Sequence, residues 1–249
     1  MFGLQKKKQE MTETDGVHLL PVGRTGASRI EEELLTVRSK EGDGIESWRV
    51  FKILAELVGG FDLLRNYDLA ATIFGSSRCT ADSAVYSEAE KLAAQLVACG
   101  FAVVTGGAHG VMQAANKGAK EAGGESVGLN IKLPAAQWPN GYTTEGMEFH
   151  YFFTRKVMLA FASEVYIFFP GGFGTLDEFF EILTLVQTKK VKAVPMILVG
   201  RAYWQPLIDW FEHTLKDGYR TIGEEDTRLY ALVDSVDEVM DVIQKRVRL

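Results

Sequence analysis

Two hydrophobic periods alternate along most of this chain. Short apolar runs predict strands, which cover residues 69–74, 101–105, 126–131, 149–153, 165–169 and 194–199. Longer stretches with apolar residues at every third or fourth position predict six helices. Three of them cover 82–99, 204–215 and 236–246. Of the other three, one ends near residue 122, one begins near 154 and one ends at 187. Strands that alternate with helices indicate βαβ units. We therefore expect an α/β fold, a single doubly wound parallel sheet with helices on both faces.

The beginning of the chain follows a different pattern. Residues 1–44 are polar and rich in small side chains, which predicts a flexible N-terminal arm. Apolar residues then return at helical spacing and predict a helix over 45–66, broken near Gly59-Gly60, with one face formed by Trp48, Phe51, Leu54, Leu57 and Val58. No linker-like composition follows, so residues 45–249 are expected to form one domain.

Composition limits the classes of function. The chain has 249 residues, 47% of them hydrophobic, and 27 Lys and Arg against 33 Asp and Glu give a net charge of −6. This acidic balance argues against a nucleic-acid partner, and no apolar run is long enough to cross a membrane. Cys79 and Cys99 form no CxxC pair, and the four histidines are scattered. We therefore expect a cytoplasmic protein with no metal site.

Glycine is abundant, at 25 residues, and two groups of it stand between a predicted strand and a predicted helix. These groups are 106–110 and 171–174. Such turns lie at the carboxyl ends of parallel strands, where α/β sheets bind ligands, and the helix start that follows suits a phosphate. Neither group completes a dinucleotide fingerprint or a P-loop, so a generic phosphate site and a merely tight turn both remain open.

The charged residues near the second glycine group also allow two interpretations. Thr175 followed by Glu178 matches a capping box, in which Glu178 only caps its own helix. Two carboxylates, Asp177 and Glu178, would also repel a phosphate unless cations lie opposite. Arg155-Lys156 could supply them. Cations in the first turn of a helix oppose its dipole at a small cost in stability. Two interpretations therefore remain open: a solvated helix start that tolerates this cost, and a pair of cations that faces an anion.

Taken together, Arg155-Lys156 and the run Pro170-Gly171-Gly172-Phe173-Gly174-Thr175-Leu176-Asp177-Glu178 resemble the RK and PGGxGTxxE motifs of the LOG ("Lonely guy") family, often labelled possible lysine decarboxylase. The resemblance extends over 69–199. It implies a Rossmann-like homodimer that hydrolyses the N-glycosidic bond of adenine-type nucleoside 5′-monophosphates, including N6-prenylated ones, to free base and ribose 5-phosphate. No cofactor is expected.

The resemblance also implies roles for individual residues. Arg155 and Glu178 match the catalytic pair. Glu178 would stabilise positive charge on the ribose or orient water, and Arg155 would stabilise the departing purine or hold the phosphate. The positions expected to contact the nucleotide are Ser76, Gly106, Gly107, Met112, Lys156, Gly172, Phe173, Gly174, Thr175 and Thr184.

Other functions remain open at this point. Longer family members often read LPxEQ where this chain has Leu133 to Gln137, and Ala136 replaces the glutamate. A non-catalytic carrier of a nucleotide or of the molybdenum cofactor on the same fold is therefore the alternative. The incomplete glycine fingerprint disfavours a dinucleotide-dependent oxidoreductase. Lysine decarboxylation is disfavoured because nothing singles out a Schiff-base lysine.

Two secondary candidates complete the expected site. Arg78 follows the first strand and could reach a phosphate. The aromatic residues within 149–153 could stack on a base, although packing in the core or in a dimer is the favoured interpretation.

Overall fold

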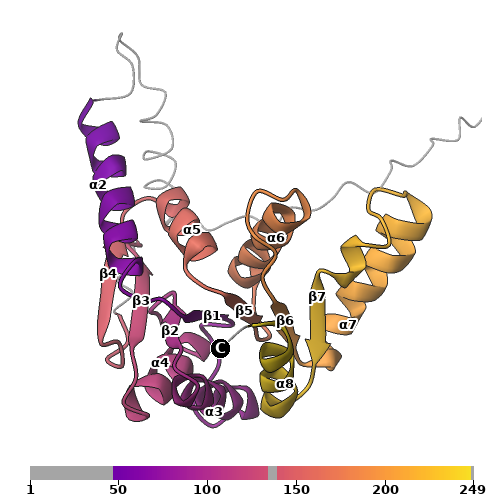
Figure 1. Cartoon of the computed structure of the whole chain (residues 1–249), viewed down its shortest axis with the longest axis horizontal. Coiled ribbons are helices and arrows are strands. Elements are labelled where there is room, and N and C mark those ends of the chain that lie inside the picture. The colour runs from indigo at the N-terminus through magenta and orange to yellow at the C-terminus, as the bar shows by residue number, and fades with distance from the viewer. Residues whose placement is uncertain (1–46, 134–138, 248–249) are drawn as a thin grey trace, which may run out of the picture. The chain divides into compact units, whose positions relative to one another are not determined.

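A computed structural model describes residues 47–133 and 139–247. The expected arm over 1–44 and the position of Ala136 lie outside these described residues. The sheet has seven parallel strands in the order β4-β3-β2-β1-β5-β6-β7 (Figure 1). Their bounds are β1 Ala70–Phe74, β2 Ala102–Thr105, β3 Ser126–Ile131, β4 Glu145–Phe149, β5 Val165–Phe168, β6 Met196–Val199 and β7 Tyr230–Val233.

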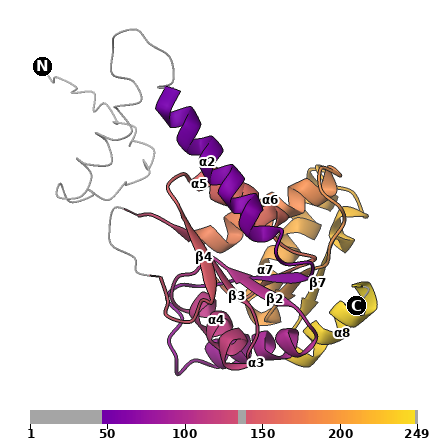
Figure 2. The same cartoon turned by 60° about the vertical axis from the view of Figure 1, so that its left-hand side comes forward.

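Helices cover both faces of this sheet. Those on one face are α3 (Ala84–Ala98), α4 (Val111–Glu121) and α8 (Val236–Arg246). Those on the other are α2 (Ser47–Leu64), α5 (Phe152–Phe161), α6 (Phe173–Gln187) and α7 (Arg201–Trp210). Figures 1 and 2 show α3, α4 and α8 together on one side, and α2, α5 and α6 together on the other. The doubly wound α/β prediction is thus confirmed.

Alternation along the strands divides the core between the two faces. In β1, Ala71 and Ile73 pack with α3, α4 and α8, whereas Ala70 and Phe74 pack with the opposite helices. All five β1 residues are buried, since this strand lies at the centre of the sheet. Both faces of a parallel sheet must be covered, which explains why the central strands are continuous apolar runs.

Strand order determines where a ligand can bind. β1 pairs with β2 on one side and with β5 on the other, so the winding of the chain reverses direction between β1 and β5. The loops that leave the carboxyl ends of these two strands diverge to opposite faces and leave a crevice. The two glycine-rich turns follow β2 and β5, as the sequence predicted.

The expected break at Gly59-Gly60 is wrong, because α2 runs through both glycines without interruption. Here glycine serves close packing. A Cβ on Gly60 would overlap the Sδ and Cγ atoms of Met158, and one on Gly59 would press on Met147. The missing side chains let α2 approach α5 and β4 closely, which outweighs the low helix propensity of glycine.

The strand predicted over 149–153 is also misplaced. The real strand, β4, precedes it, and α5 already begins at Phe152. β4 is an edge strand that pairs only with β3, and most of its side chains are exposed. Its polar sequence therefore lacks the apolar signal of a buried strand, whereas the aromatic run after it imitates one.

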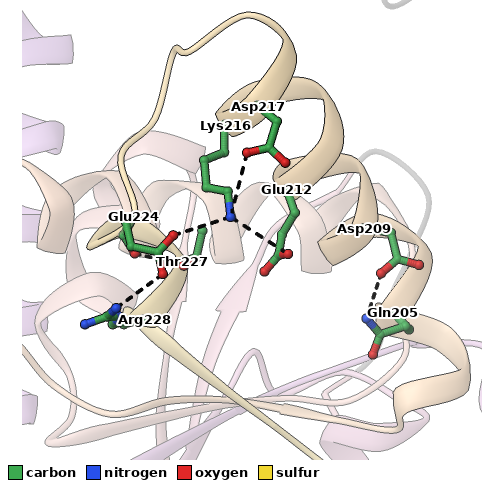
Figure 3. A network of polar contacts seen from close by, with 8 residues as sticks. All are labelled: Gln205, Asp209, Glu212, Lys216, Asp217, Glu224, Thr227 and Arg228. Carbon is green, nitrogen blue, oxygen red and sulfur yellow. Dashed lines mark hydrogen bonds and ion pairs between the residues drawn. The ribbon is translucent and has the colours of Figure 1, made fainter.

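The C-terminal part differs in detail from the prediction. β7 was not predicted, and the helix expected over 204–215 is α7 followed by a π-helical segment, Phe211–Gly218. Lys216 holds this segment to the loop before β7, because its Nζ lies 3.4 Å from Glu224, 3.9 Å from Asp217 and 4.0 Å from Glu212 (Figure 3). The acidic partners of these ion pairs are exposed, so the pairs contribute little to stability, and they involve no residue of the glycine turns.

Across the described residues, no helix is long and apolar enough to cross a membrane.

Candidate functional site

A pocket of about 670 Å³ opens at the carboxyl ends of β1, β2 and β5. This is the crevice that the strand order predicts. The pocket brings together one face of α5 and the loops after β1, β2 and β5, which are far apart in sequence. Its lining consists of Phe74, Gly75, Ser76, Ser77, Arg78, Gly106, Met112, Phe152, Arg155, Leu159, Gly171, Gly172, Phe173, Gly174, Thr175, Leu176, Asp177 and Glu178.

The turn after β2 is held from below by a buried polar network. The Thr105 hydroxyl accepts a hydrogen bond from Gly107 N–H at 2.9 Å and donates to Asn116 at 2.6 Å. Asn140 closes the network, because its amide donates to Asn116 Oδ1 and its backbone N–H donates to Gly107 O. Gly107 has a φ of +69°, a backbone conformation that favours glycine, which explains why glycine occupies this position. The network fixes the wall of the pocket that Gly106 provides.

The turn after β5 leads directly into α6. The N-cap of this helix is Gly172, with no side-chain capping bond, and the helix begins at Phe173. The capping-box interpretation of Thr175 and Glu178 is therefore wrong, because both residues already lie inside the helix. The first turn of α6 faces the pocket, where backbone N–H groups and the positive end of the helix dipole favour an anion.

Arg155 reaches the pocket from the first turns of α5 and is anchored to backbone carbonyls. Its Nε donates to Leu129 O at 2.7 Å, and its Nη2 lies 3.4 Å from Gly106 O. A Cβ on Gly106 would overlap this guanidinium, so the glycine makes room for the arginine. Burial lowers the pKa of Arg155, while the negative charge of Glu178 opposes that shift. Arg155 and Glu178 thus interact as nearby charges.

Glu178 is a buried carboxyl group, with 7% of the residue exposed. Its Oε2 accepts no hydrogen bond from any described residue. Burial raises the pKa of Glu178 to about 7, although Lys156 and Arg155 both oppose this shift. A carboxyl group with its pKa near neutrality, in a pocket beside an arginine, is an arrangement typical of functional sites.

Lys156 lies against the acidic first turns of α6. Its Nζ is 2.6 Å from Asp177, 2.8 Å from Glu181 and 3.8 Å from Glu178. Burial lowers the pKa of Lys156, but its hydrogen bonds with Asp177 and Glu181 outweigh this and raise it. The inference that cations lie opposite the carboxylates is thus confirmed for Lys156, whose contacts are with the protein's own acids.

The structure brings most of the predicted site residues together, but not all. Gly107 supports the pocket from behind, and Lys156 contacts Glu178 without lining the pocket. Thr184 lies exposed on α6, outside the pocket. Phe152, one of the aromatic candidates for stacking, lines the pocket beside Arg155, and so does Leu159, which sequence reasoning missed. Their spacing of three and four residues from Arg155 places all three on one helical face, a pattern that could have identified them.

Comparison with known proteins agrees with this geometry. Residues 112–243, more than half of the chain, match the family described as possible lysine decarboxylase. The chain belongs to this family, the LOG family.

Two LOG relatives show the extent of the likeness. A cytokinin riboside 5′-monophosphate phosphoribohydrolase of Rhodococcoides fascians is 32% identical over 124 residues, which cover 48% of this chain and 62% of that protein. A probable enzyme of the same name from Oryza sativa subsp. japonica is 27% identical over 158 residues, covering 63% of this chain and 74% of the relative. The chain thus spans less than two thirds of the bacterial relative.

Solved structures show the same fold at lower identity. The structural-genomics target TM1055 has a TM-score of 0.55 and 24% identity, covering 71% of this chain and 99% of its own. A molybdenum cofactor binding protein from Rippkaea orientalis has a TM-score of 0.52 and 20% identity, covering 71% and 94%. At identities this low, both comparisons show only that the chain shares the Rossmann-like LOG fold.

The buried Glu178 makes stability depend on pH. Because folding raises its pKa from 4.5 to about 7, the folded state binds this proton more tightly than the unfolded state. The resulting stabilisation is fully present below pH 4.5 and is lost as the pH rises towards 7. Glu178→Gln removes this dependence. The change that this substitution causes in the free energy of unfolding should therefore be more favourable at pH 8 than at pH 4, by about 3 kcal/mol.

Urea unfolding of both proteins at pH 4 and pH 8 measures this difference. Exposed Glu225 provides a control, since Glu225→Gln should show no such gain. Equal effects of Glu178→Gln at both pH values would contradict the raised pKa.

Proposed function

We propose that this protein hydrolyses the N-glycosidic bond of adenine-type nucleoside 5′-monophosphates, AMP or N6-prenyl-AMP, to free base and ribose 5-phosphate. The observation that carries the proposal is Glu178, a buried carboxyl group with a free oxygen and a pKa of about 7, at the edge of a glycine turn and beside Arg155. LOG family membership and relatives named as phosphoribohydrolases support it.

The phosphate would bind at the start of α6. The backbone N–H groups of Gly172, Phe173 and Gly174 lie at the pocket with no capping side chain in their way. Ser76 and Arg78, in the loop after β1, line the same pocket and would add a hydroxyl group and a positive charge. A phosphate held at this end of the pocket would use its binding energy to position the glycosidic bond.

The base would lie at the other side of the pocket. Phe74, Phe152 and Leu159 give that part an apolar surface, and Phe152 is 58% exposed and therefore available for stacking. Apolar surface suits adenine and N6-prenyl groups alike. The pocket volume, about 670 Å³, is in the range typical of small-molecule sites.

Glu178 and Arg155 would act on opposite ends of the bond that breaks. As the bond to the purine breaks, the ribose gains positive charge, which the ionised Glu178 would stabilise while it orients the attacking water. The purine gains negative charge, which Arg155 would stabilise electrostatically. Arg155 is not assigned the role of proton donor, because an arginine side chain does not deprotonate in proteins.

A second copy of this chain is the partner that we propose. Outward-facing apolar residues form a stripe along α2, where Trp48 is 76%, Phe51 60%, Leu54 54% and Val58 53% exposed. These residues lie on α2, as their helical spacing predicted, and within the described residues the stripe is uncovered. A continuous apolar surface of this kind is typical of a protein interface.

The compartment that we propose is the cytoplasm. Cys79 and Cys99 are both free thiols in the structure, as expected for a reducing environment.

Release of free base is the direct test of the proposed activity. Purified protein incubated with AMP or N6-isopentenyl-AMP should release the base, measured by chromatography. Glu178→Ala should reduce the rate by about 10²-fold or more, because it removes the group that stabilises the ribose charge. Glu225→Ala, which removes an exposed carboxylate outside the pocket, should keep the wild-type rate. A wild-type protein that binds nucleotide but releases no base would instead support the carrier alternative.

The pH dependence of the same assay tests the role of Glu178. If its ionised form acts, kcat/KM should rise about tenfold per unit below pH 7 and become constant above it. A profile that falls above pH 7 would mean that the protonated form acts, as a general acid.

The homodimer is tested by light scattering after size exclusion. Two chains of 27.6 kDa should elute as one species of twice that mass. Phe51→Glu should shift this species towards the monomer because it places a charge in the stripe, whereas Trp210→Glu, at an exposed aromatic residue of α7, should not. A monomeric wild-type protein would rule the dimer out.

A further inference from the structure

The helix that carries Arg155 and Lys156 begins without a cap of its own. The N-cap of α5 is Tyr151, whose side chain makes no capping hydrogen bond. An uncapped start destabilises the first turn of a helix and lets it fray. Arg155 is the fourth residue of α5 and Lys156 the fifth, so both depend on that turn.

A residue far away in sequence holds the chain where this helix begins. Glu56, on α2, accepts a hydrogen bond from His150 N–H at 2.7 Å and one from Tyr151 N–H at 3.3 Å. The hydroxyl of Thr154 donates to the same carboxylate at 2.5 Å. One carboxylate thus binds three donors on both sides of the point where α5 begins. Its negative charge also lies at the positive end of the α5 dipole.

The packing of α2 on α5 is built around this contact. Thr154, directly before Arg155, is fully buried. Four residues after Glu56, Gly60 lies so close to Met158 that a Cβ would overlap it. Gly60 therefore brings the two helices together one turn from the carboxylate. The contact joins an element outside the family match, which begins at residue 112, to the helix of the RK motif.

We propose that Glu56 is a positioning residue for the reaction, which holds the first turn of α5 so that Arg155 and Lys156 face Glu178. This inference rests on the proposed function. The Arg155 guanidinium is anchored at its far end by Leu129 O and Gly106 O. Glu56 anchors the backbone from which this side chain extends. With both ends held, the charge of Arg155 has a defined place relative to the substrate.

The test compares three variants on the two helices. Glu56→Gln keeps the size of the side chain but loses the charge and replaces one of the two acceptor oxygens with an NH₂ group, so that it cannot accept from all three donors. Thr154→Val keeps the shape of the buried residue and loses one of the three hydrogen bonds. Asp62→Ala is the control on the same helix, because it removes an exposed carboxylate of α2 whose ion pair among the described residues is with Arg65.

Activity per folded molecule is the first measurement. Circular dichroism gives the folded fraction, and kcat and KM for base release from AMP are measured at a temperature where each variant is folded. A misplacement of the catalytic charge by about 1 Å costs up to 10²-fold in rate. We therefore expect kcat to fall about tenfold or more in Glu56→Gln, with a smaller fall in Thr154→Val and none in Asp62→Ala. A role in stability alone would lower the melting temperature and leave kcat unchanged.

Hydrogen exchange of backbone amides is the second measurement, and it needs no substrate. In Glu56→Gln, or in Thr154→Val if the first variant does not fold, peptides covering the start of α5 should exchange faster than in wild type. Peptides covering α6 should be unchanged. Faster exchange together with unchanged kcat would overturn the positioning role, and so would unchanged exchange. If the wild-type protein releases no base, the proposed function fails, and faster exchange with weakened AMP binding would still support the positioning role.

Discussion

The burial of one carboxyl group, Glu178, is the constraint around which the pocket is organised. A buried carboxylate needs nearby positive charge, and in this protein two residues of a different helix provide it. Lys156 forms ion pairs with the acids of α6, and Arg155 acts at longer range from its anchors on β3 and the β2 turn. The compensation is incomplete, so the pKa of Glu178 remains near 7. That incomplete compensation is what makes the group suitable for chemistry at neutral pH.

The topology of the sheet makes this encounter possible. Because the chain winds outwards in both directions from β1, the turns after β1, β2 and β5 meet at one edge. Glycine serves this edge in two ways. Gly106 makes room for Arg155, and Gly172, which has open space beside it, offers no side chain to cap the start of α6. The glycine abundance of the chain is thus partly a requirement of this pocket.

Helix α2, the first helix in the described part of the chain, links two otherwise separate features. Its inner side brings Glu56 to the start of α5 and packs closely through Gly59 and Gly60. Its outer side carries the exposed apolar stripe that includes Trp48 and Phe51. The same amphipathic helix therefore supports the helix that carries Arg155 on one side and leaves an apolar surface exposed on the other.

The sequence by itself determined the alternation of strands and helices, the two glycine turns and the family motifs, because these depend on local periodicity and on spacing. It misjudged elements whose context is tertiary. The polar β4 is a strand because of its edge pairing with β3, and α2 continues through two glycines because its neighbours require close contact. Thr175 and Glu178 form no capping box because α6 begins earlier.

Only the tertiary structure decided which charges meet. The motifs predicted that Arg155, Lys156 and Glu178 lie close together. They could not show that Lys156 pairs with Asp177 and Glu181 while Arg155 binds backbone carbonyls. They also gave no sign of Glu56, which lies 94 residues before the N–H of His150 that it binds. Hydrogen bonds and burial act through space at distances of a few ångströms. The pKa of Glu178 and the contacts of Glu56 at the start of α5 therefore depend on partners that sequence order does not reveal.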